Sequence, residues 1–448
     1  MGAIWDKYAE RPTLAQLEGD IKTDVLVIGG GLAGILCGYM LKNKGIDYAV
    51  VEADKICSST TGNTTAKITF QHGLIYDKLI EKYGIEFARL YLKSQQEALE
   101  NYRKLSEKIP CDFKESASFV YSVSNREKLE KEALAYEKLG CKAEFTEALK
   151  LPFKAVGAVC VKNQAQFNPL KFLYALSEDL KIYENTKVTQ FKPGYVVTNR
   201  GKIHAKKIIV ATHFPLLNKH GGYFIKMYQH RSYVLALHGA GDLNGMYVDE
   251  DKKGLSFRSY NGSMIIGGGS HRTGKKGGGF EELLNFKKLY YPQAEEICRW
   301  ATQDCMTLDD IAYIGQYSKS TPDIYVATGF NKWGFTSAMT AADILTDLVS
   351  GKENEYSAVF TPSRSILHPQ LAVNTLESIA GIIKPSSPRC PHMGCALKYN
   401  PQEHSWDCPC HGSRFKENGE LINNPANADL KKSPECKKGN NNTEKNSL

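Results

Sequence analysis

The segment that decides the fold is Val25-Leu-Val-Ile-Gly29-Gly-Gly-Leu-Ala-Gly34, near the start of the chain. Its first four residues are continuously apolar, which is typical of a strand buried on both faces of a parallel sheet. Gly29 permits a tight turn, Gly31 lets a pyrophosphate approach the backbone, and Gly34 lets the following helix pack closely on the strand. The N–H groups at the start of that helix then face the phosphates.

A second strand, Tyr48-Ala-Val-Val51, ends at Glu52. The spacing from the glycines is close to the roughly 20 residues at which an acid binds a ribose diol in dinucleotide-binding units. A carboxylate at this position disfavours a 2′-phosphate, so NADP is not expected. The order and spacing of these features, from the first strand through the glycine turn and helix to the second strand and its acid, predict dinucleotide binding. The alternative is a glycine-rich turn without a ligand.

Composition limits the class of protein. The 448 residues predict two or three domains, and the 42% hydrophobic content is sufficient for ordinary cores and excludes general disorder. The net charge is 57 − 49 = +8 and is spread in pairs without long basic runs. We therefore expect neither nucleic acid nor a membrane surface as a partner.

The sequence also bears on the compartment. The N-terminal residues lack a basic segment followed by an apolar one, so no signal peptide is expected. The longest uncharged run, Val25 to Leu41, is rich in glycine and shorter than the roughly 20 residues of a membrane helix. We expect a cytoplasmic protein without an integral membrane span, in which most of the 12 cysteines are reduced.

Further along the chain, apolar spacing of three and four residues predicts helices over 76–110 and 124–140. Residues 203–212 read as a short strand and 221–272 as β-rich, and 324–349 read as strand, loop and helix. A connecting region with a helix near 370–383 follows, and the last dozen residues are polar and expected to be disordered.

Cysteine and histidine are concentrated in two short motifs, Cys390-Pro-His392-Met-Gly-Cys395 and Cys408-Pro-Cys410-His411-Gly-Ser413. Each motif offers one Cys and one His at C-x-H or C-x-x-H spacing. Zinc fingers pair Cys with Cys and His with His, so a zinc site is the weaker alternative, beside a site that has lost its metal. The two motifs closely resemble the Rieske [2Fe–2S] signature.

This resemblance implies that Cys390 and Cys408 bind one iron and that His392 and His411 bind the other. It also implies a disulfide between Cys395 and Cys410, although a disulfide is unusual in a reducing cytosol. Ser413 would donate a hydrogen bond to the cluster. The segment after Lys384 is shorter than is usual for such a domain, so the module is expected to depend on the rest of the chain. The other cysteines, among them Cys57 and Cys436, are interpreted as ordinary thiols.

A second strand–Gly–helix unit, at Ala327-Thr328-Gly329, follows late in the chain. The early and late units, with the Ser58–Thr65 segment and the Ala211-Thr212 turn, make residues of about 20–350 resemble the FAD-dependent amino acid oxidase and dehydrogenase (glycine oxidase-like) family. The resemblance implies FAD contacts at Gly29, Gly30, Gly31, Gly34, Glu52, Thr61, Thr65, Val188, Ala211, Gly329, Gly334 and Thr336.

Catalytic residues are poorly resolved, because flavin oxidation mostly requires positioning of the substrate. A substrate carboxylate would bind an Arg clamp, so Arg231, Arg258 and Arg272 are weak candidates, with His271 beside them. A structural salt bridge or hydrogen bond is the more common role for each.

The predicted fold class is therefore α/β: a Rossmann-like FAD-binding domain with an inserted α+β substrate domain, and a small all-β C-terminal Rieske module. The FAD-binding parts are placed at about 20–75, 155–215 and 310–350, and the substrate domain at about 76–154 and 216–309. Residues 1–360 form the oxidoreductase, 361–384 a linker with a helix, 385–435 the Rieske module and 436–448 a tail.

The predicted function is an FAD-dependent dehydrogenase of a small amine or amino acid that passes electrons singly through the Rieske [2Fe–2S] cluster to an external acceptor. One alternative reverses the flow, so that an external donor feeds the flavin through the cluster. A third hypothesis is a redox-sensing protein without turnover.

Overall fold

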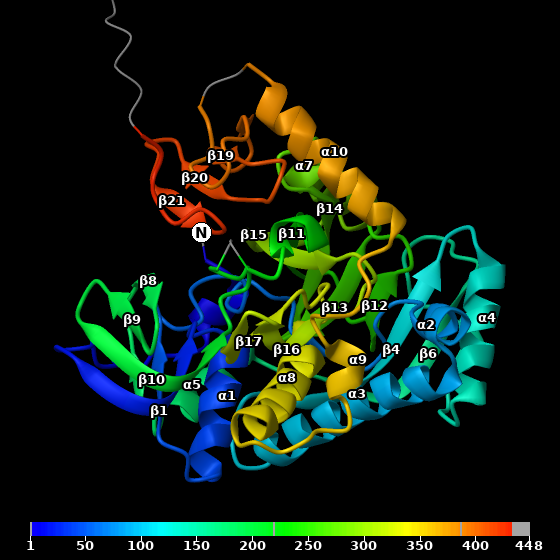
Figure 1. The fold of residues 1–448 in the computed structure, drawn as a ribbon. Coiled ribbons are helices and arrows are strands. Elements are labelled where there is room, and N and C mark those ends of the chain that lie inside the picture. The colour runs from blue at the N-terminus through cyan, green and yellow to red at the C-terminus, as the bar shows by residue number, and fades with distance from the viewer. Residues whose placement is uncertain (1, 218–219, 386–387, 432–448) are drawn as a thin grey trace, which may run out of the picture.

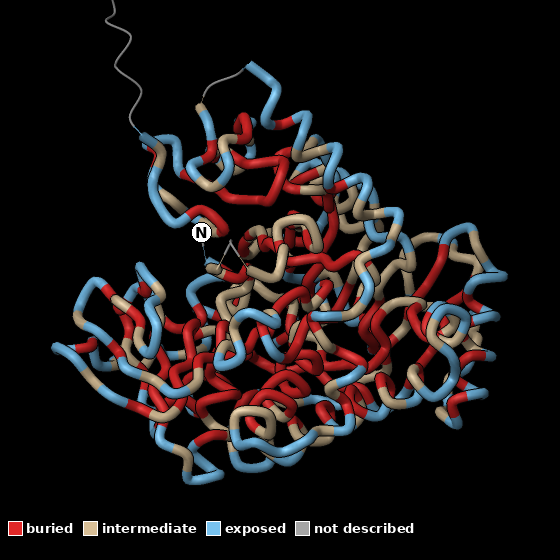
Figure 2. The backbone as a smooth tube through the Cα atoms, viewed as in Figure 1, coloured by how far each residue is buried: buried red, intermediate tan, exposed pale blue. Residues whose placement is uncertain are grey.

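The computed structural model describes residues 2–217, 220–385 and 388–431 (Figure 1). Cys436 and the predicted tail lie outside these residues. Within them, no helix is both long and apolar enough to cross a membrane. The described chain forms three sheets, and Figure 2 shows that the buried backbone concentrates in the two larger ones and in the region where the C-terminal sheet meets them.

The first sheet has eight strands and carries the N-terminal glycine motif. Its central order is β16 (Tyr313–Ser318), β17 (Thr321–Thr328), β10 (Lys202–Val210), β1 (Ile21–Ile28), β2 (Tyr48–Val51) and β7 (Ile182–Tyr183). Strand β9 (Tyr195–Thr198) also pairs with β10, and β8 (Val188–Lys192) pairs with β9. From β17 to β7 the neighbouring strands run parallel. Helices α1 (Leu32–Asn43), α5 (Pro169–Ser177) and α8 (Gly334–Val349) pack together beside this sheet.

Strand β1 explains why its sequence is apolar without alternation. Val25 and Val27 belong to the core shared with α1 and α8, while Leu26 and Ile28 belong to a separate core on the other face. A parallel strand covered on both faces buries every side chain. The first strand, the glycine turn and the first helix therefore form as the sequence predicts.

The second sheet has nine strands and forms the substrate domain. Its order is β15 (Glu295–Thr307), β11 (Met227–His238), β14 (Ser263–Arg272), β13 (Ser256–Tyr260), β12 (Met246–Asp249), β4 (Lys114–Ser122), β6 (Gly157–Gln166) and β3 (Lys67–Ile68), and β5 (Glu144–Thr146) pairs with β6. The accompanying helices are α2 (Tyr76–Tyr83), α3 (Ile85–Ser106), α4 (Arg126–Lys138) and α7 (Gly279–Tyr290).

Two features of this sheet differ from the sequence prediction. The helix expected over 76–110 is broken at Gly84, whose φ of 87° ends α2 and begins α3. Strand β6 pairs with β4 in the substrate sheet, whereas residues from 155 onward were placed in the FAD-binding part. Along the chain, the return to the FAD-binding sheet begins after β6, with α5 and β7.

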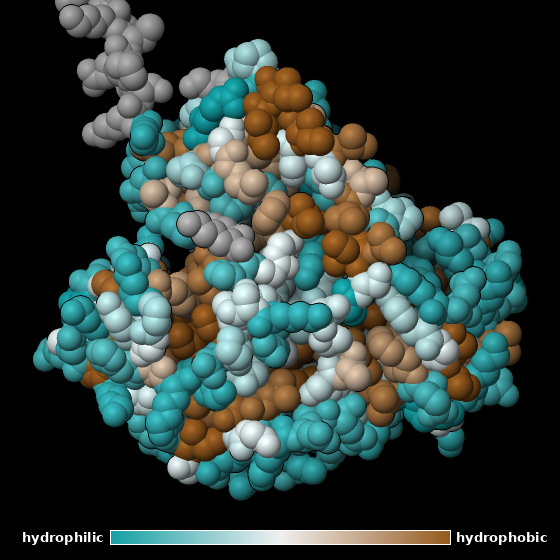
Figure 3. Space-filling model, viewed as in Figure 1, coloured by the Kyte–Doolittle hydropathy of each residue, from teal (hydrophilic) through white to brown (hydrophobic). Residues whose placement is uncertain are grey.

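The C-terminal module is a four-stranded antiparallel sheet, in the order β18 (Lys398–Asn400), β19 (Ser405–Asp407), β20 (Arg414–Lys416) and β21 (Leu421–Asn423). Helix α10 (Pro369–Ile383) precedes it, and the short helices η1 (Ile4–Lys7), α6 (Tyr223–Lys226) and α9 (Ser357–Phe360) complete the described elements. The outer side of α10 exposes Leu376, Ile379 and Ile383, and Figure 3 shows apolar side chains gathered near its end. The α/β fold with a small all-β module is as predicted.

Candidate functional site

The glycine turn after β1 leaves no room for side chains. Gly29 has φ +115°, and a Cβ there would lie 2.6 Å from the carbonyl oxygen of Ala211. A Cβ on Gly34 would lie only 1.8 Å from the carbonyl oxygen of Gly29. The helix thus approaches the turn as closely as a backbone can, which is the geometry that places a helix N-terminus against a pyrophosphate.

Side chains from two other segments reach the same turn. Glu52 accepts a hydrogen bond of 2.7 Å from the Gly30 N–H, and burial raises the pKa of its carboxyl. Thr61 accepts one of 3.0 Å from the Leu32 N–H in the first turn of α1. The N-cap of this helix, Gly31, supplies no side-chain cap. The residues present fit a dinucleotide cofactor, with backbone N–H groups for the phosphates and an acid for the ribose.

The late strand–Gly–helix unit meets the early one. A Cβ on Gly334, the first residue of α8, would lie 4.0 Å from Leu32 at the start of α1, so the two helix N-termini are neighbours. Thr336 donates a hydrogen bond of 3.1 Å to the Thr69 carbonyl, and Gly329 turns the chain with φ +71°.

The remaining residues expected to contact FAD lie on three further segments. The Ala211 N–H donates to Ile28, the Thr65 carbonyl accepts from Arg258, and Val188 opens β8. The assignment of the individual FAD contacts stays a prediction.

The two Cys–His motifs form matching loops. Gly394 donates to the carbonyl of Cys390, and Gly412 donates to the carbonyl of Cys408, so each loop closes over four residues at a glycine with positive φ. Cys395 and Cys410 form a disulfide that joins the loops, which confirms the predicted pairing.

The proposed cluster ligands converge between these loops. The Cys390 and Cys408 thiols are buried, and the neighbouring Cys408 thiol lowers the pKa of Cys390 to about 7. The imidazole rings of His392 and His411 lie 5.0 Å apart. Both ring nitrogens of His392, and Nδ1 of His411, are buried and have no hydrogen-bond partner among the described residues. An imidazole binds an iron through one nitrogen, and each of the two rings has an unpartnered buried nitrogen for this role, so the residues fit a [2Fe–2S] cluster.

The sulfurs of Cys395, Cys408 and Cys410 also lie within 4.8 Å of one another. Two of them are bonded to each other and cannot act as thiolate ligands. The disulfide therefore flanks the site rather than belonging to it. Helix α10 covers the same side, because a Cβ on Gly381 would lie 2.3 Å from the Cys410 sulfur. Ser378, also on α10, lies 3.4 Å from Nε2 of His411.

Of the four weak catalytic candidates, Arg231 contacts the Rieske module. Its guanidinium pairs bidentately with Glu403, and both side chains are almost completely buried. Tyr233 donates to the same carboxylate, and Arg414 pairs with it from the module side. A guanidinium paired in this way is not free to bind a substrate carboxylate.

The other candidates are also occupied by protein groups. Arg272 donates to the carbonyls of Pro409 and Cys410 in the second cluster loop. His271 bonds to Tyr233 and to its own neighbour in the strand. Arg258 donates to the carbonyls of Thr65 and Ala66, at the end of the Ser58–Thr65 segment that is the predicted flavin loop. Burial lowers the pKa of Arg258 to about 9.

Sequence reasoning missed the opposite face of the same strands. Side chains alternate along a strand, so His230 points away from the face of β11 that carries Arg231. His230 of β11 pairs in register with Asp304 of β15, and Lys332, in the loop before α8, lies 3.5 Å from Ser270 of β14. Ser270 in turn bonds to Ser232 of β11 at 3.0 Å. The alternation of side chains along β11 could have predicted this face from the sequence.

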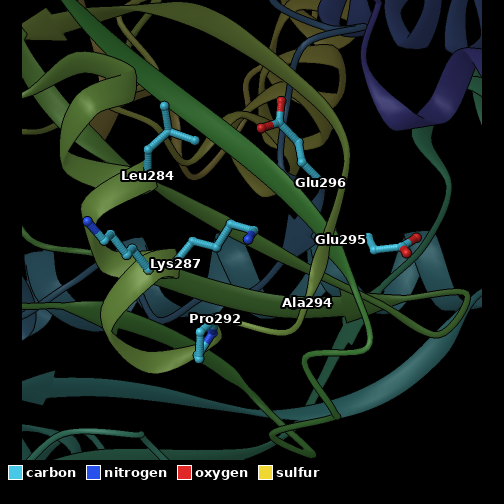
Figure 4. Close-up of a pocket in the computed structure, with 7 residues that line it drawn as sticks. Leu284, Lys287, Pro292, Ala294, Glu295 and Glu296 are labelled. Carbon is cyan, nitrogen blue, oxygen red and sulfur yellow. The ribbon is translucent and has the colours of Figure 1, made fainter.

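A surface hollow of about 620 Å³ lies between α7 and β15 (Figure 4). Its lining includes Lys287, Lys288, Glu295 and Glu296. None of its lining residues belongs to the glycine turn, the flavin loop or the cluster loops, so we assign it no part in the chemistry.

The site defines a flavoprotein joined to a Rieske module, through the glycine turn, the late helix and the cluster loops. The chain belongs to the FAD dependent oxidoreductase family, whose sequence model matches residues 24–348. The Rieske [2Fe-2S] domain model matches residues 352–434, so the match begins well before residue 385, where the module was predicted to start. The protein is an FAD-dependent oxidoreductase with a Rieske [2Fe–2S] domain.

The chain is 34% identical to the putative Rieske 2Fe-2S iron-sulfur protein YhfW of Bacillus subtilis, over 95% of this chain and 96% of that protein. It is 24% identical to gamma-glutamylputrescine oxidoreductase of Escherichia coli, over 79% and 89%. The fold is similar to that of glycine oxidase from Geobacillus kaustophilus, with a TM-score of 0.65, 18% identity, and coverage of 77% of this chain and 99% of that one.

A fragment of residues 385–448 is expected not to retain a stable cluster. It lacks α10, whose Gly381 packs against Cys410, and it lacks Arg231, so Glu403 keeps no partner from the substrate sheet. Iron content and the visible spectrum of the purified fragment measure this. A fragment of residues 352–448 is the matched control and should retain more iron, because it restores α10. A soluble shorter fragment with a Rieske spectrum would contradict the prediction.

Proposed function

We propose that the protein is a dehydrogenase of a small amine or amino acid, and that its electrons leave singly through the Rieske module to an external acceptor. When bound, FAD supplies a two-electron oxidation and the cluster a one-electron transfer. Amine-oxidising relatives and neighbours support the substrate class, and the fused module supports an electron outlet within the chain. We place the protein in the cytoplasm, because most of the cysteines among the described residues are free thiols.

The observation that carries the proposal is a bridge built on Gln303 of β15. Its side-chain amide donates a hydrogen bond of 2.9 Å to the Gly412 carbonyl, in the second cluster loop. Its backbone carbonyl accepts one of 3.0 Å from Thr60, in the predicted flavin loop. Thr273 donates to its side-chain oxygen. One residue thus contacts both cofactor loops, and it is buried from water.

A second link fixes the distance between the two sites. Asn424, beyond β21, donates to the carbonyls of Thr212 and Phe214, which follow the Ala211 turn beside the glycine motif. On the far side of the cluster, His392 is only partly buried and Met393 is 41% exposed. The cluster loops therefore offer one side to the flavoprotein and the edge near His392 to solvent, where an external acceptor can approach.

Anaerobic stopped-flow mixing with a panel of amines and amino acids tests the proposal. Absorbance of the flavin is expected to decrease first and that of the cluster afterwards. Reduction of the cluster before the flavin by an external donor, with no reduction by the panel, would contradict it and favour the reversed flow. Changed partner affinity without turnover by any donor would favour the redox sensor.

Replacing Gln303 by alanine is expected to slow reduction of the cluster by about tenfold and to change flavin reduction by less than about twofold. The substitution removes the contacts to Gly412 and Thr273 but leaves the flavin loop bonded to the backbone carbonyl. The two phases of the same stopped-flow trace measure both rates. Gln316→Ala, at an exposed position of β16, is the control and should change neither rate. Equal slowing of both phases would argue against the bridge.

A further inference from the structure

The face of the substrate sheet that carries His230 and Asp304 holds charged groups without an ion-pair partner among the described residues. We propose that Lys332, Asp304 and His230 form the polar end of the substrate site. The Lys332 ammonium binds the carboxylate of the substrate, and the Asp304 carboxyl binds the amine of the same molecule. This inference rests on the proposed function and narrows it to substrates that carry both groups, that is, amino acids rather than simple amines.

The strand register brings these groups together. His230 and Asp304 are directly opposite each other on the antiparallel strands β11 and β15, so their side chains share one face at neighbour distance. Lys332 reaches the same face from the loop before α8, through Ser270 at 3.5 Å, and Ser270 bonds to Ser232, two residues after His230. The three groups therefore surround one spot on the sheet.

The loop that carries Lys332 is held in an unusual conformation. Asn331 and Lys332 both have positive φ, 51° and 73°. The Asn331 side chain fixes this shape by accepting from the Thr307 N–H at 2.7 Å and donating to the Gly329 carbonyl at 2.7 Å. Left-handed backbone at residues other than glycine is costly and persists where the surroundings enforce it, often at binding sites. Here it presents the lysine beside the start of α8.

Neither charge has an ion-pair partner within 4.0 Å among the described residues. Other cations face the same region, but they are occupied: Lys252 pairs with Asp310 at 2.7 Å, and Arg272 donates to carbonyls of the cluster loop. His271 bonds to Tyr233 and Arg231 pairs with Glu403. Lys332 itself donates to neutral groups, the Lys252 carbonyl at 3.4 Å and the Ser270 hydroxyl at 3.5 Å. Lys332 and Asp304 are therefore the cation and the acid of this region that have no ion-pair partner among the described residues.

Burial and access both favour a ligand at this spot. The Nδ1 atom of His230 is buried and has no hydrogen-bond partner among the described residues, although the residue is 8% exposed. Burial raises the pKa of Asp304 to about 6, against the opposing charges of Lys332 and Arg231. Lys332 is exposed to solvent and Asp304 partly so, which leaves a route for a small molecule. A ligand with an amine and a carboxylate would satisfy all three groups.

Titrations of the FAD-loaded, cluster-containing protein test the assignment. The probes are the proteinogenic amino acids and sarcosine, each matched with its decarboxylated amine, and the readout is the dissociation constant from the change in the flavin spectrum. In Lys332→Met we expect the affinity for amino acids to fall at least tenfold, with affinity for the matched amines unchanged. In Asp304→Asn we expect affinity for both sets to fall.

Two further variants keep the test sharp. Lys332→Arg retains the charge and should retain the preference for amino acids over amines, whereas Lys252→Met removes a neighbouring paired cation and should leave the preference unchanged. Flavin content of each variant is measured first, so that loss of cofactor is not read as loss of substrate affinity. If the wild-type protein binds probes but Lys332→Met keeps the same preference, the subsite is overturned and the proposed function stands. If the wild-type protein binds no probe, the proposed substrate class fails, and the subsite with it.

Discussion

Replacing Gly34 by alanine is expected to leave the protein without bound FAD. The added Cβ would lie 1.8 Å from the carbonyl oxygen of Gly29, and a backbone atom cannot rotate away as a side chain can. The start of α1 must therefore move off β1, which displaces the N–H groups that are predicted to bind the pyrophosphate. Overpacking of this kind costs about 1–3 kcal/mol in stability, and the misplaced turn costs affinity in addition.

Flavin released from the purified variant by denaturation measures the effect, and we expect less than about a tenth of the wild-type content. Gly45→Asn is a matched control at the other end of the same helix. Gly45 has φ +67° with nothing within 4 Å of a built Cβ, and asparagine tolerates that conformation. The control should bind FAD normally. Wild-type flavin content in Gly34→Ala would refute the assignment of this turn to the cofactor.

Replacing Arg231 by alanine is expected to destabilise the seam between the substrate sheet and the Rieske module by about 3–5 kcal/mol, because the substitution leaves a buried carboxylate without its main partner. Glu403 is held by both Nε and a terminal nitrogen of Arg231, and Arg414 alone remains to compensate it. Protease cleavage near the module and the midpoint of denaturant unfolding report the loss.

Two controls separate this pair from surface charge. Arg126→Ala removes an exposed arginine whose pairs with Glu130 and Glu147 lie at the surface, and should leave the midpoint of unfolding nearly unchanged. In Arg231→Ala/Glu403→Ala the unpaired carboxylate is gone, so the double variant should be more stable than Arg231→Ala alone. A double variant whose loss of stability equals the sum of the two single losses would show that the charges do not interact.

The pair of Arg231 and Glu403 also predicts how the stability of the contact between the substrate sheet and the Rieske module depends on pH. Burial alone would raise the pKa of Glu403, but the hydrogen bond and charge of Arg231, with Arg414, outweigh burial and lower the pKa to about 2. The carboxyl has a pKa of about 4.3 in an unfolded chain. Its stabilisation is therefore complete above that value and is lost as the pH falls from about 4.3 to 2.

The parts of the molecule that depend on local chemistry could be predicted from the sequence. Gly34 needs glycine because the Gly29 carbonyl lies against it, a contact inside the motif, whereas Gly29 itself is confined by the distant carbonyl of Ala211. The two Cys–His motifs carry their predicted ligands within a few positions. The disulfide of Cys395 and Cys410 was predicted from the resemblance of these motifs to the Rieske signature.

What could not be predicted depends on which strand lies beside which, and on which side a residue faces. The boundary at residue 155 was misplaced because β6 pairs with β4, a contact that no local pattern near 157–166 announces. Arg231 and His271 were selected because they are charged or titratable and lie on the correct strands. Their neighbour His230 faces the other way, and only the packing of the Rieske module distinguishes the two faces.

The buried pair of Arg231 and Glu403 also bears on how such fusions can be exchanged. A Rieske module transplanted from another protein onto this flavoprotein would bury Arg231 opposite whatever residue it brings, and only an acid at the place of Glu403 would satisfy it. Charge and hydrogen-bond geometry at this interface therefore decide which Rieske modules the flavoprotein can accept. Chimeras should therefore be chosen by this pair and by the amide of Asn424, rather than by similarity of the cluster loops.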